Sequence, residues 1–323
     1  MNRRQFFTTS AGLAGAFAVS HGILAAPARK SSLTPQEFQA KIVGPVLSVP
    51  TCYRQDLSLD MPGMRRIVEL GISSGCGIVT LTAGNNQYDL LSYDEIKDLT
   101  REIIDAVDGR AVIIAATGKW ETDQAVDYAK FASDLGADAL QVTLPALDDD
   151  RMIEHFAAMA AATPMGIVLH GDPPMPLMSR LLEIESVVAF KEEYTTIYSL
   201  QIYRSFGKRI TLFAGGEKAR LLTFYPYGMR AWYSTFMTFA PSVAVQFWSA
   251  IQADDLKRAG EIVLRYETPV FQRWSHAFWR ATCEHFGLAS RWIRGSETAF
   301  NDEQMQELAM FFESLELRPI GNR

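Results

Sequence analysis

The stretch AVIIAATGKWETDQAVDYAKFASDLGADALQVT, residues 111–143, decides the fold class. It begins with a short apolar run, Ala111–Ala115, and ends with another, Ala139–Thr143. Both runs are continuous rather than alternating, which suits strands that are buried on two faces. Between them, Thr122–Leu135 has apolar side chains at helical spacing, and Gly136 is a residue that commonly ends a helix. The stretch therefore predicts a strand–helix–strand unit of a parallel sheet.

The same alternation continues on both sides of this unit. Apolar runs predict eight strands, at Val46–Pro50, Gly77–Leu81, Ala111–Ala115, Ala139–Thr143, Gly166–His170, Val187–Lys191, Ile210–Ala214 and Ala231–Thr235. Amphipathic segments predict helices between them, among others at Pro62–Ser74, Ser92–Val107, Thr122–Leu135 and Asp150–Ala161. Ser92 and Glu95 form the capping-box pattern. Eight such units favour a closed (β/α)8 barrel, the TIM barrel, over an open sheet.

The strand pattern stops at Pro241. Beyond it, four segments predict a C-terminal helical extension, at Ser242–Gln252, Asp254–His276, Ala277–Phe286 and Asn301–Leu315. We therefore expect a barrel over residues 29–241 and a helical region over residues 242–323. The length of the chain after its first 28 residues is normal for a barrel with added helices.

The first 28 residues have the order of features of an export signal. The pair Arg3-Arg4 precedes two aromatic residues, a small and apolar run extends from about Ala11 to Ala26, and Ala26-Pro27-Ala28 offers a cleavage site. This order resembles a twin-arginine (Tat) signal, and it predicts a periplasmic protein. The apolar run is too short and too rich in Gly and Ser to span a bilayer, so no membrane association is expected once the signal is removed.

The composition of the chain argues against several classes of partner and cofactor. The hydrophobic content of 48% supports a large core, and the net charge of −6 without a long basic run argues against nucleic acid as a partner. The three cysteines show no disulfide framework and are interpreted as buried apolar residues. No phosphate loop, dinucleotide fingerprint or metal-ligand spacing is present, so neither a cofactor nor a metal is predicted.

In a barrel of this kind the active site lies at the carboxyl ends of the strands. Lys191 ends the apolar run Val187–Phe190, so its side chain should start inside the barrel. A lysine there is costly to keep charged, and a free amine is a nucleophile for a carbonyl group. The alternative is a structural lysine paired with a carboxylate, for which Glu192, Glu193 and Glu217 are candidates.

Val187–Glu192 resembles the sixth strand of the dihydrodipicolinate synthase / N-acetylneuraminate lyase family, in which this lysine forms a Schiff base with pyruvate. Other segments resemble the family in the same order, namely Gly44–Thr51, Leu91–Glu95, Gly136–Ala139, His155-Phe156, Gly215–Glu217 and Phe239–Pro241. Each of these motifs is weak alone, but the ordered set is specific. The resemblance extends from about Ile42 to Arg265 and continues into a helical region of matching length.

The chain departs from the family after its second strand. The family has Gly-Thr-Thr-Gly-Glu there, whose hydroxyls and backbone amides hold the pyruvate carboxylate, whereas this chain has Ala83–Gln87 with the sequence Ala-Gly-Asn-Asn-Gln. The side-chain amides of Asn85 and Asn86 and the N–H groups of Gly84–Asn86 could donate to a carboxylate. Alternatively, Gly and Asn only supply positive φ angles to a turn.

A second departure follows the fifth strand. His170 stands where the family has its proton-relay tyrosine, within Leu169–Pro173. A histidine can shuttle protons near neutral pH, although a core histidine bonded to backbone is the alternative. Synthases of the family have an arginine for a second carboxylate a few residues later, where this chain has Pro174–Pro176. This difference argues against dihydrodipicolinate synthesis.

The resemblance implies a Schiff-base-forming lyase, an aldolase or a dehydratase, that acts on pyruvate or a related 2-oxo acid or sugar acid and assembles as a homotetramer or homodimer. Lys191 and His170 are the expected catalytic residues. The expected substrate-binding residues are Thr51, Gly84, Asn85, Asn86, Thr143 and Gly216. Two alternatives remain: a non-catalytic periplasmic binding protein on the same barrel, and a hydrolase that uses Asp172 and Glu192 as a carboxylate pair.

Overall fold

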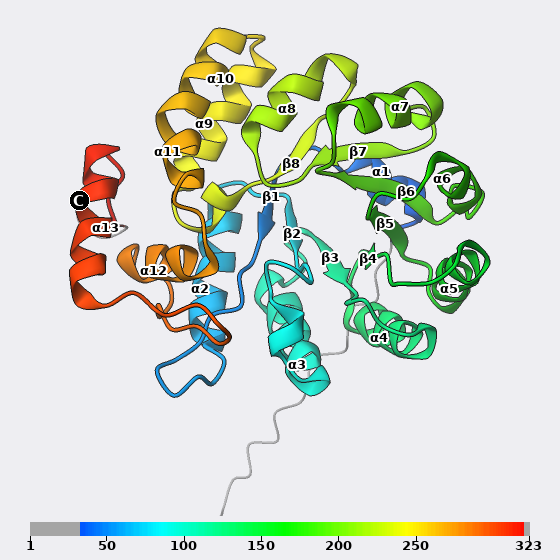
Figure 1. The fold of residues 1–323 in the computed structure, drawn as a ribbon, viewed down its shortest axis with the longest axis horizontal. Coiled ribbons are helices and arrows are strands. Elements are labelled where there is room, and N and C mark those ends of the chain that lie inside the picture. Colours follow the sequence, from blue (N-terminus) through cyan, green and yellow to red (C-terminus); the bar gives the residue numbers. More distant parts are fainter. Residues whose placement is uncertain (1–32, 320–323) are drawn as a thin grey trace, which may run out of the picture.

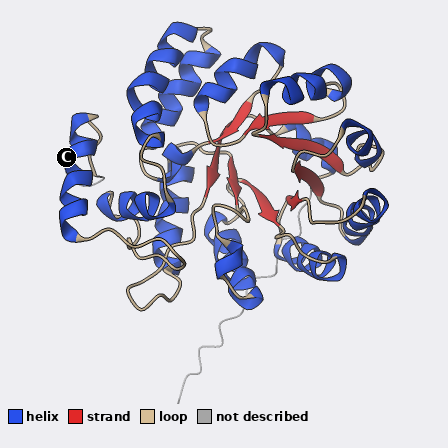
Figure 2. Ribbon diagram, in the orientation of Figure 1, coloured by secondary structure: helices blue, strands red, loops and turns tan. Residues whose placement is uncertain are grey.

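The computed structural model describes residues 33–319, so the expected export signal lies outside the described residues. Eight parallel strands close into a barrel in sequence order (Figures 1 and 2). They are β1 Gly44–Ser48, β2 Ile78–Thr80, β3 Val112–Ala116, β4 Ala139–Thr143, β5 Gly166–His170, β6 Val187–Glu192, β7 Thr211–Ala214 and β8 Ala231–Tyr233. The predicted (β/α)8 fold with C-terminal helices is confirmed, and each predicted strand overlaps an observed one.

Helices surround the barrel, and each follows the strand that the chain has just left (Figure 1). They are α2 Met61–Ser73, α3 Tyr93–Val107, α4 Thr122–Leu135, α5 Asp149–Ala162, α6 Met175–Leu181, α7 Thr196–Phe206 and α8 Lys218–Phe224. Local signals set their ends. Ser92 and Glu95 form the predicted capping box of α3. Gly136 ends α4 in the left-handed conformation, at φ 101°.

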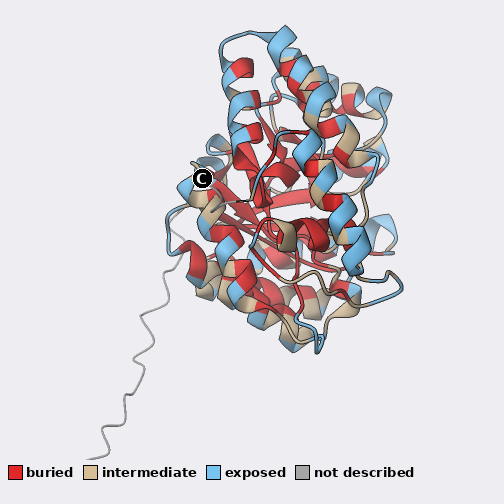
Figure 3. Cartoon of the chain, turned by 90° about the vertical axis from the view of Figure 1, so that its left-hand side faces the viewer, coloured by how far each residue is buried: buried red, intermediate tan, exposed pale blue. Residues whose placement is uncertain are grey.

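Side chains alternate across each strand, so the barrel has two apolar layers. Outward-facing residues pack beneath the helices, and Figure 3 shows this buried layer between the sheet and the exposed helix faces. Inward-facing residues such as Val46, Ile114 and Val168 fill the barrel itself. The short helix α1, Pro35–Ala40, adds the fully buried Phe38 to this inner cluster. A Cβ on Gly166 would lie 2.7 Å from the Phe38 ring, so the ring fits here only because residue 166 has no side chain.

The C-terminal extension comprises α9 Pro241–Gln252, α10 Leu256–Ile262, α11 Thr268–Phe271, α12 His276–His285 and α13 Asp302–Ser314. The helix predicted over Asp254–His276 is shorter than expected: it runs from Leu256 through a π-helical turn at Val263–Glu267 to Phe271, and residues 272–275 are not helical. Pro269 follows this turn and has no N–H to donate to an i−4 carbonyl. The turn places Glu267 where its carboxylate accepts from the N–H groups of Lys218 and Ala219, at 2.6 and 2.9 Å.

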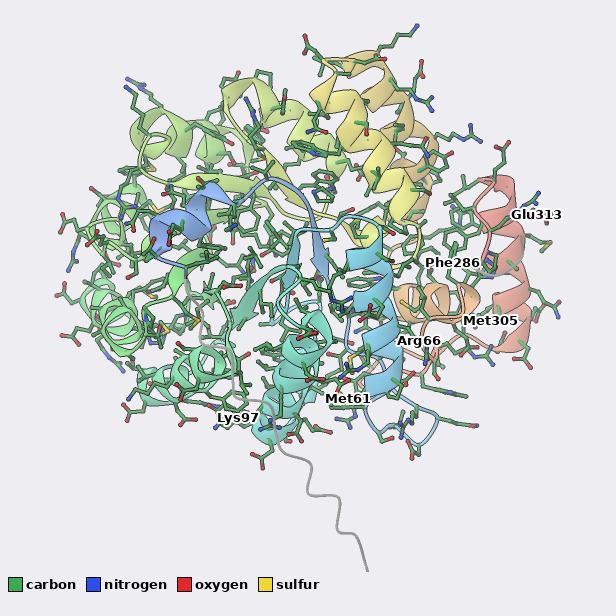
Figure 4. All side chains as sticks on the ribbon, turned by 180° about the vertical axis from the view of Figure 1, so that it is seen from behind. Met61, Arg66, Lys97, Phe286, Met305 and Glu313 are labelled. Atoms are coloured by element: carbon green, nitrogen blue, oxygen red, sulfur yellow. The ribbon has the colours of Figure 1, made fainter. Side chains whose placement is uncertain are left out.

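The extension packs beside α2 on one side of the barrel (Figure 4). Arg66 of α2 donates through Nε to the carbonyl oxygen of Leu288, 2.6 Å away. Phe286 packs on Phe312 of α13, with ring centroids 5.1 Å apart. Cys52, Cys76 and Cys283 are free and buried, as expected. None of the helices within residues 33–319 has the length and apolar character needed to cross a bilayer.

Candidate active site

Strand alternation brings Lys191 into the mouth of the barrel. Its side chain is only 9% exposed, and its Nζ lies 3.0 Å from Oε2 of Glu193 and 4.9 Å from the centre of the Tyr233 ring. Lys191 therefore faces inward, as predicted, and it is paired with one of the three carboxylates that the structural alternative named. Glu193 belongs to the same inward row because it follows Lys191 by two residues.

Glu192 points to the opposite side of the strand, into the helix layer. Its carboxylate is fully buried, accepts from the N–H of Tyr194 at 3.0 Å and from the hydroxyl of Ser199, and pairs with Arg220 at 2.9 Å. These partners hold the carboxylate away from the barrel mouth. The hydrolase alternative thus loses one of the two carboxylates that it requires.

His170 ends β5 beside Lys191 and bonds to the same carboxylate. Its Nε2 lies 2.6 Å from Oε1 of Glu193 and 3.5 Å from Nζ of Lys191. On the other side of the ring, Nδ1 lies 3.4 Å from Nε2 of Gln141 and 3.5 Å from Oγ1 of Thr143. The two predicted catalytic residues are thus brought together, with Thr143 next to them. Sequence reasoning did not assign Glu193 or Gln141 to the site.

The polarity of these hydrogen bonds sets the tautomer of His170. The hydroxyl of Tyr233 donates to Oε1 of Gln141, which leaves Nε2 of Gln141 facing the imidazole. An amide NH2 only donates, so Nδ1 of His170 must be the accepting nitrogen. In the neutral ring the proton is then on Nε2, where it is donated to Glu193.

The site is a partly buried cluster with alternating charge. Burial lowers the pKa of His170 below its usual 6.5, more than the Glu193 hydrogen bond raises it. Burial alone would raise the pKa of Glu193, but the hydrogen bond from His170 and the charge of Lys191 outweigh it and lower this pKa to about 2. At neutral pH the Glu193 side chain is therefore an ionised carboxylate and the His170 ring is a neutral imidazole.

Gly215, just after β7, leaves room for the Glu193 side chain. A Cβ on Gly215 would overlap the carboxylate and would lie 2.6 Å from Cβ of Glu193. Gly216, which the sequence predicted to line the pocket, is the next residue and has a left-handed φ of 65°. Of these two glycines, Gly215 is therefore the one that lies against Glu193.

A pocket of about 410 Å³ lies against the outer side of Glu193. Its lining consists of Asp172, Glu193, Tyr194, Thr195 and Tyr198. The Glu193 side chain is 36% exposed, whereas Lys191 is not among the lining residues. A molecule in this pocket would therefore contact Glu193 and not the lysine amine.

The loop after β2 is held together by the residues that were predicted to bind a carboxylate. The side chain of Asn86 is buried, accepts from the N–H of Thr82 at 2.7 Å and donates to the carbonyl of Val49 at 2.8 Å. Thr51 donates its hydroxyl to the carbonyl of Asn86 at 2.9 Å. Both side chains shape the loop, so a carboxylate bound by the Asn86 amide would have to displace these partners.

Asn85 and Gly84 are placed differently. Asn85 donates its side-chain amide to the Ser48 hydroxyl at 2.8 Å and its N–H to Oγ1 of Thr82 at 3.2 Å. A Cβ built on Gly84 would meet nothing within 4 Å, so this residue borders open space. The carboxylate site at Gly84–Asn86 stays a prediction, and Gly84 is its most accessible member.

Arg280 on α12 is a site-supporting residue that sequence reasoning missed. It is fully buried and donates through Nε to the carbonyl of Thr51 at 2.8 Å and through Nη2 to Asn85 and Gln87 at 3.2 and 3.1 Å. Its Nη1 has no hydrogen-bond partner among the described residues. Burial lowers its pKa. A buried guanidinium from the C-terminal extension thus holds the loop after β2 in place.

Within residues 33–319 no three His, Cys, Asp or Glu side chains are grouped so that they could hold a metal ion. The groups that meet at the site are the Lys191 amine, the Glu193 carboxylate, the His170 imidazole and the Gln141 amide. Such a set can transfer protons and attack a carbonyl carbon.

Comparisons with known proteins agree with this architecture. The model of the dihydrodipicolinate synthetase family matches residues 41–310. A 4-hydroxy-tetrahydrodipicolinate synthase of Chelativorans sp. is 27% identical over 230 residues, which cover 68% of this chain and 78% of the relative. A probable 5-dehydro-4-deoxyglucarate dehydratase of Streptomyces avermitilis is 27% identical over 235 residues, which cover 69% of this chain and 71% of the relative.

Solved structures show the same fold at lower identity. A dihydrodipicolinate synthase from Bacillus clausii superposes with a TM-score of 0.77 at 18% identity, covering 87% of this chain and 100% of the other. An N-acetylneuraminate lyase from Mycoplasma synoviae gives a TM-score of 0.77 at 18% identity, covering 85% of this chain and 98% of the other.

Proposed function

Since the chain belongs to the dihydrodipicolinate synthetase family, we propose that it is a Schiff-base-forming lyase, either an aldolase or a dehydratase. Its substrate in this proposal is pyruvate, a related 2-oxo acid or a sugar acid. The observation that carries the proposal is the position of Lys191 near the end of β6: its side chain is only 9% exposed, and its Nζ lies 3.5 Å from Nε2 of His170. Relatives of this chain are named as synthases and as a dehydratase.

Each residue then has a role in the proposed chemistry. The amine of Lys191 attacks the ketone carbon, and the resulting iminium withdraws electrons from the bond that breaks in the next step. His170 transfers the proton of that step through Nε2, the ring nitrogen that faces Lys191 and Glu193. Gly84 and Asn85 lie at the rim where the substrate carboxylate would be held, and Thr143 positions the imidazole.

A second candidate function is favoured by one observation, the ion pair between Lys191 and Glu193 at 3.0 Å. An ammonium that stays paired is no nucleophile. In that case the barrel would bind a 2-oxo acid or a sugar acid without turnover, as a periplasmic binding protein.

Borohydride reduction separates the two functions. The purified protein is incubated with sodium borohydride and each member of a panel of 2-oxo acids and sugar acids, and the intact mass is measured. A lyase yields a covalent reduced adduct with at least one compound, which requires substrate and reductant together. Binding that is detected by calorimetry without any adduct supports the binding protein and contradicts the lyase.

Export and assembly belong to the same proposal. We expect the protein in the periplasm, and replacing Arg3 and Arg4 by lysine should retain it in the cytoplasm of the cell that makes it. We expect a homotetramer or a homodimer, which light scattering on the purified protein would reveal. A monomer, or export that does not depend on the arginine pair, would contradict these two parts.

A further inference from the structure

We propose that Glu193 is a catalytic residue of the Schiff-base step: it takes the proton from the Lys191 ammonium and returns it to the oxygen that leaves as water. This inference rests on the proposed function, since it describes a step of the same reaction. Its basis is the bridging position of one carboxylate between the amine and the imidazole.

The two oxygens of Glu193 have different partners. Oε2 lies 3.0 Å from Nζ of Lys191, and Oε1 lies 2.6 Å from Nε2 of His170. The amine and the imidazole nitrogen themselves are 3.5 Å apart, at the limit of a hydrogen bond. The carboxylate is therefore the closer proton acceptor for the amine, and Nε2–H of His170 holds its other oxygen in place.

The residues around Glu193 leave space for its carboxylate in the mouth of the barrel. It follows the last residue of β6, with its side chain on the inward row, and Gly215 provides the space in which the carboxylate lies. The structural ion pair and hydrogen bonds at this edge are made by its neighbour Glu192 with Arg220 and Ser199. Glu192 thus makes the structural contacts at this edge of the barrel, and the Glu193 carboxylate contacts the amine and the imidazole of the site.

The proton affinity of Glu193 depends on the charge of Lys191. That charge is one of the interactions that lower the pKa of Glu193 to about 2, together with the His170 hydrogen bond and against the effect of burial. When the lysine gives up its proton, the part of the lowering that its charge causes disappears, while burial and the His170 hydrogen bond remain, so the pKa of the carboxylate rises. The other ionisable groups that interact with this cluster are Tyr233, Tyr194 and Lys119.

The proton balance closes within the site. The ammonium gives one proton to Glu193, and the free amine attacks the ketone carbon while the carbonyl π electrons move to oxygen. A proton moves from this nitrogen to this oxygen, which gives the carbinolamine. Glu193 then returns its proton to the hydroxyl, the C–O bond breaks, water leaves, and the nitrogen lone pair forms the iminium. No proton is exchanged with the solvent.

The test is the rate of adduct formation with pyruvate under cyanoborohydride, for the wild type, Glu193→Gln and Glu193→Asp, from pH 6 to pH 9. We expect Glu193→Gln to form the adduct about 10²-fold more slowly at pH 7, with a rate that rises about tenfold per pH unit. The wild-type rate should be nearly independent of pH, because its proton transfer is internal. Glu193→Asp should keep this flat profile at an intermediate rate.

A purely structural role of Glu193 predicts the opposite change in the rate of adduct formation. If Glu193 only holds the lysine in its charged form, Glu193→Gln releases the amine and forms the adduct as fast as the wild type or faster, which overturns the inference. Gly215→Ala is a second variant, in which the carboxylate is displaced but retained, and it should also slow the reaction. If Glu193→Gln does not fold, the rate of adduct formation by Gly215→Ala is compared with that of the wild type instead.

Two controls complete the design. Glu313, whose side chain points outward from α13 (Figure 4), is exposed, and Glu313→Gln should leave both rate and profile unchanged. Absence of an adduct in the wild type with every member of the 2-oxo acid and sugar acid panel contradicts the proposed function itself. An adduct in the wild type together with an unaffected Glu193→Gln contradicts only the role of Glu193.

Discussion

Nε of Arg280, on α12, lies 2.8 Å from the carbonyl oxygen of Thr51, just beyond β1. Through this bond and two weaker ones, the C-terminal extension is attached directly to the rim of the barrel at the loop after β2. The extension is thus part of the candidate site.

Arg280→Met should therefore affect both stability and substrate binding. The change leaves the carbonyls of Thr51 and Asn85 buried without a donor, and we expect the free energy of unfolding to fall by about 2–4 kcal/mol. The KM for the 2-oxo acid should rise more than kcat falls, because the loop loses its support. Urea titration and steady-state kinetics measure the two effects. Arg318→Met, at an exposed position, is the control, and an Arg280→Met protein that equals it would contradict this role.

Tyr233→Phe should reduce the rate of proton transfer without preventing adduct formation. The Tyr233 hydroxyl fixes the orientation of the Gln141 amide, which in turn accounts for the tautomer of His170. Loss of one such hydrogen bond corresponds to about 1 kcal/mol, which is roughly a fivefold decrease in kcat. Single-turnover kinetics should show this decrease with KM nearly constant. A rise in KM with kcat constant would show that Tyr233 contacts the substrate instead.

The Glu193 carboxylate should make stability depend on pH in acid. Its pKa is lowered from 4.5 to about 2 in the folded protein. The stabilisation is therefore fully present above about pH 4.5 and is lost as the pH falls toward 2. The difference in free energy of unfolding between the wild type and Glu193→Gln should therefore decrease as the pH falls from about 4.5 toward 2. A difference that grows between pH 4.5 and pH 2 would contradict the lowered pKa of Glu193.

Gly84→Ala tests the predicted carboxylate site with little effect on the fold. A Cβ on Gly84 meets no atom within 4 Å, so the free energy of unfolding should change by less than about 0.5 kcal/mol. If the substrate carboxylate lies against this residue, the added methyl group should raise KM several-fold. Gly75→Ala would not serve as a control because its φ of 89° is strained for alanine, whereas Gly77→Ala is in equally open space. An unchanged KM would remove Gly84 from the site.

The barrel could be predicted from the sequence because its signals are local. Continuous apolar runs mark strands that are buried on both faces, and Ser92 and Gly136 set helix ends through bonds within a few residues. Lys191 could be identified for the same reason, since an ionisable residue that ends a buried run must lie at the mouth.

The partners of Lys191 could not be assigned as surely, because they depend on contacts between strands. Glu193 was only one of several acidic residues nearby, and its choice depends on the room that Gly215 provides from the next strand. Gln141 gave a signal that was overlooked, a polar residue inside the buried run Ala139–Thr143. Arg280 gave none, because its bonds to Thr51 and Asn85 join segments that are about two hundred residues apart.

The most direct test of the Schiff-base account is to locate the reduced adduct on the chain. The wild type is reduced in the presence of pyruvate, digested, and its peptides are sequenced by tandem mass spectrometry. The account predicts the modification on Lys191 and its absence in Lys191→Arg. An adduct on Lys119, Lys218 or a surface lysine, with Lys191 unmodified, would contradict it.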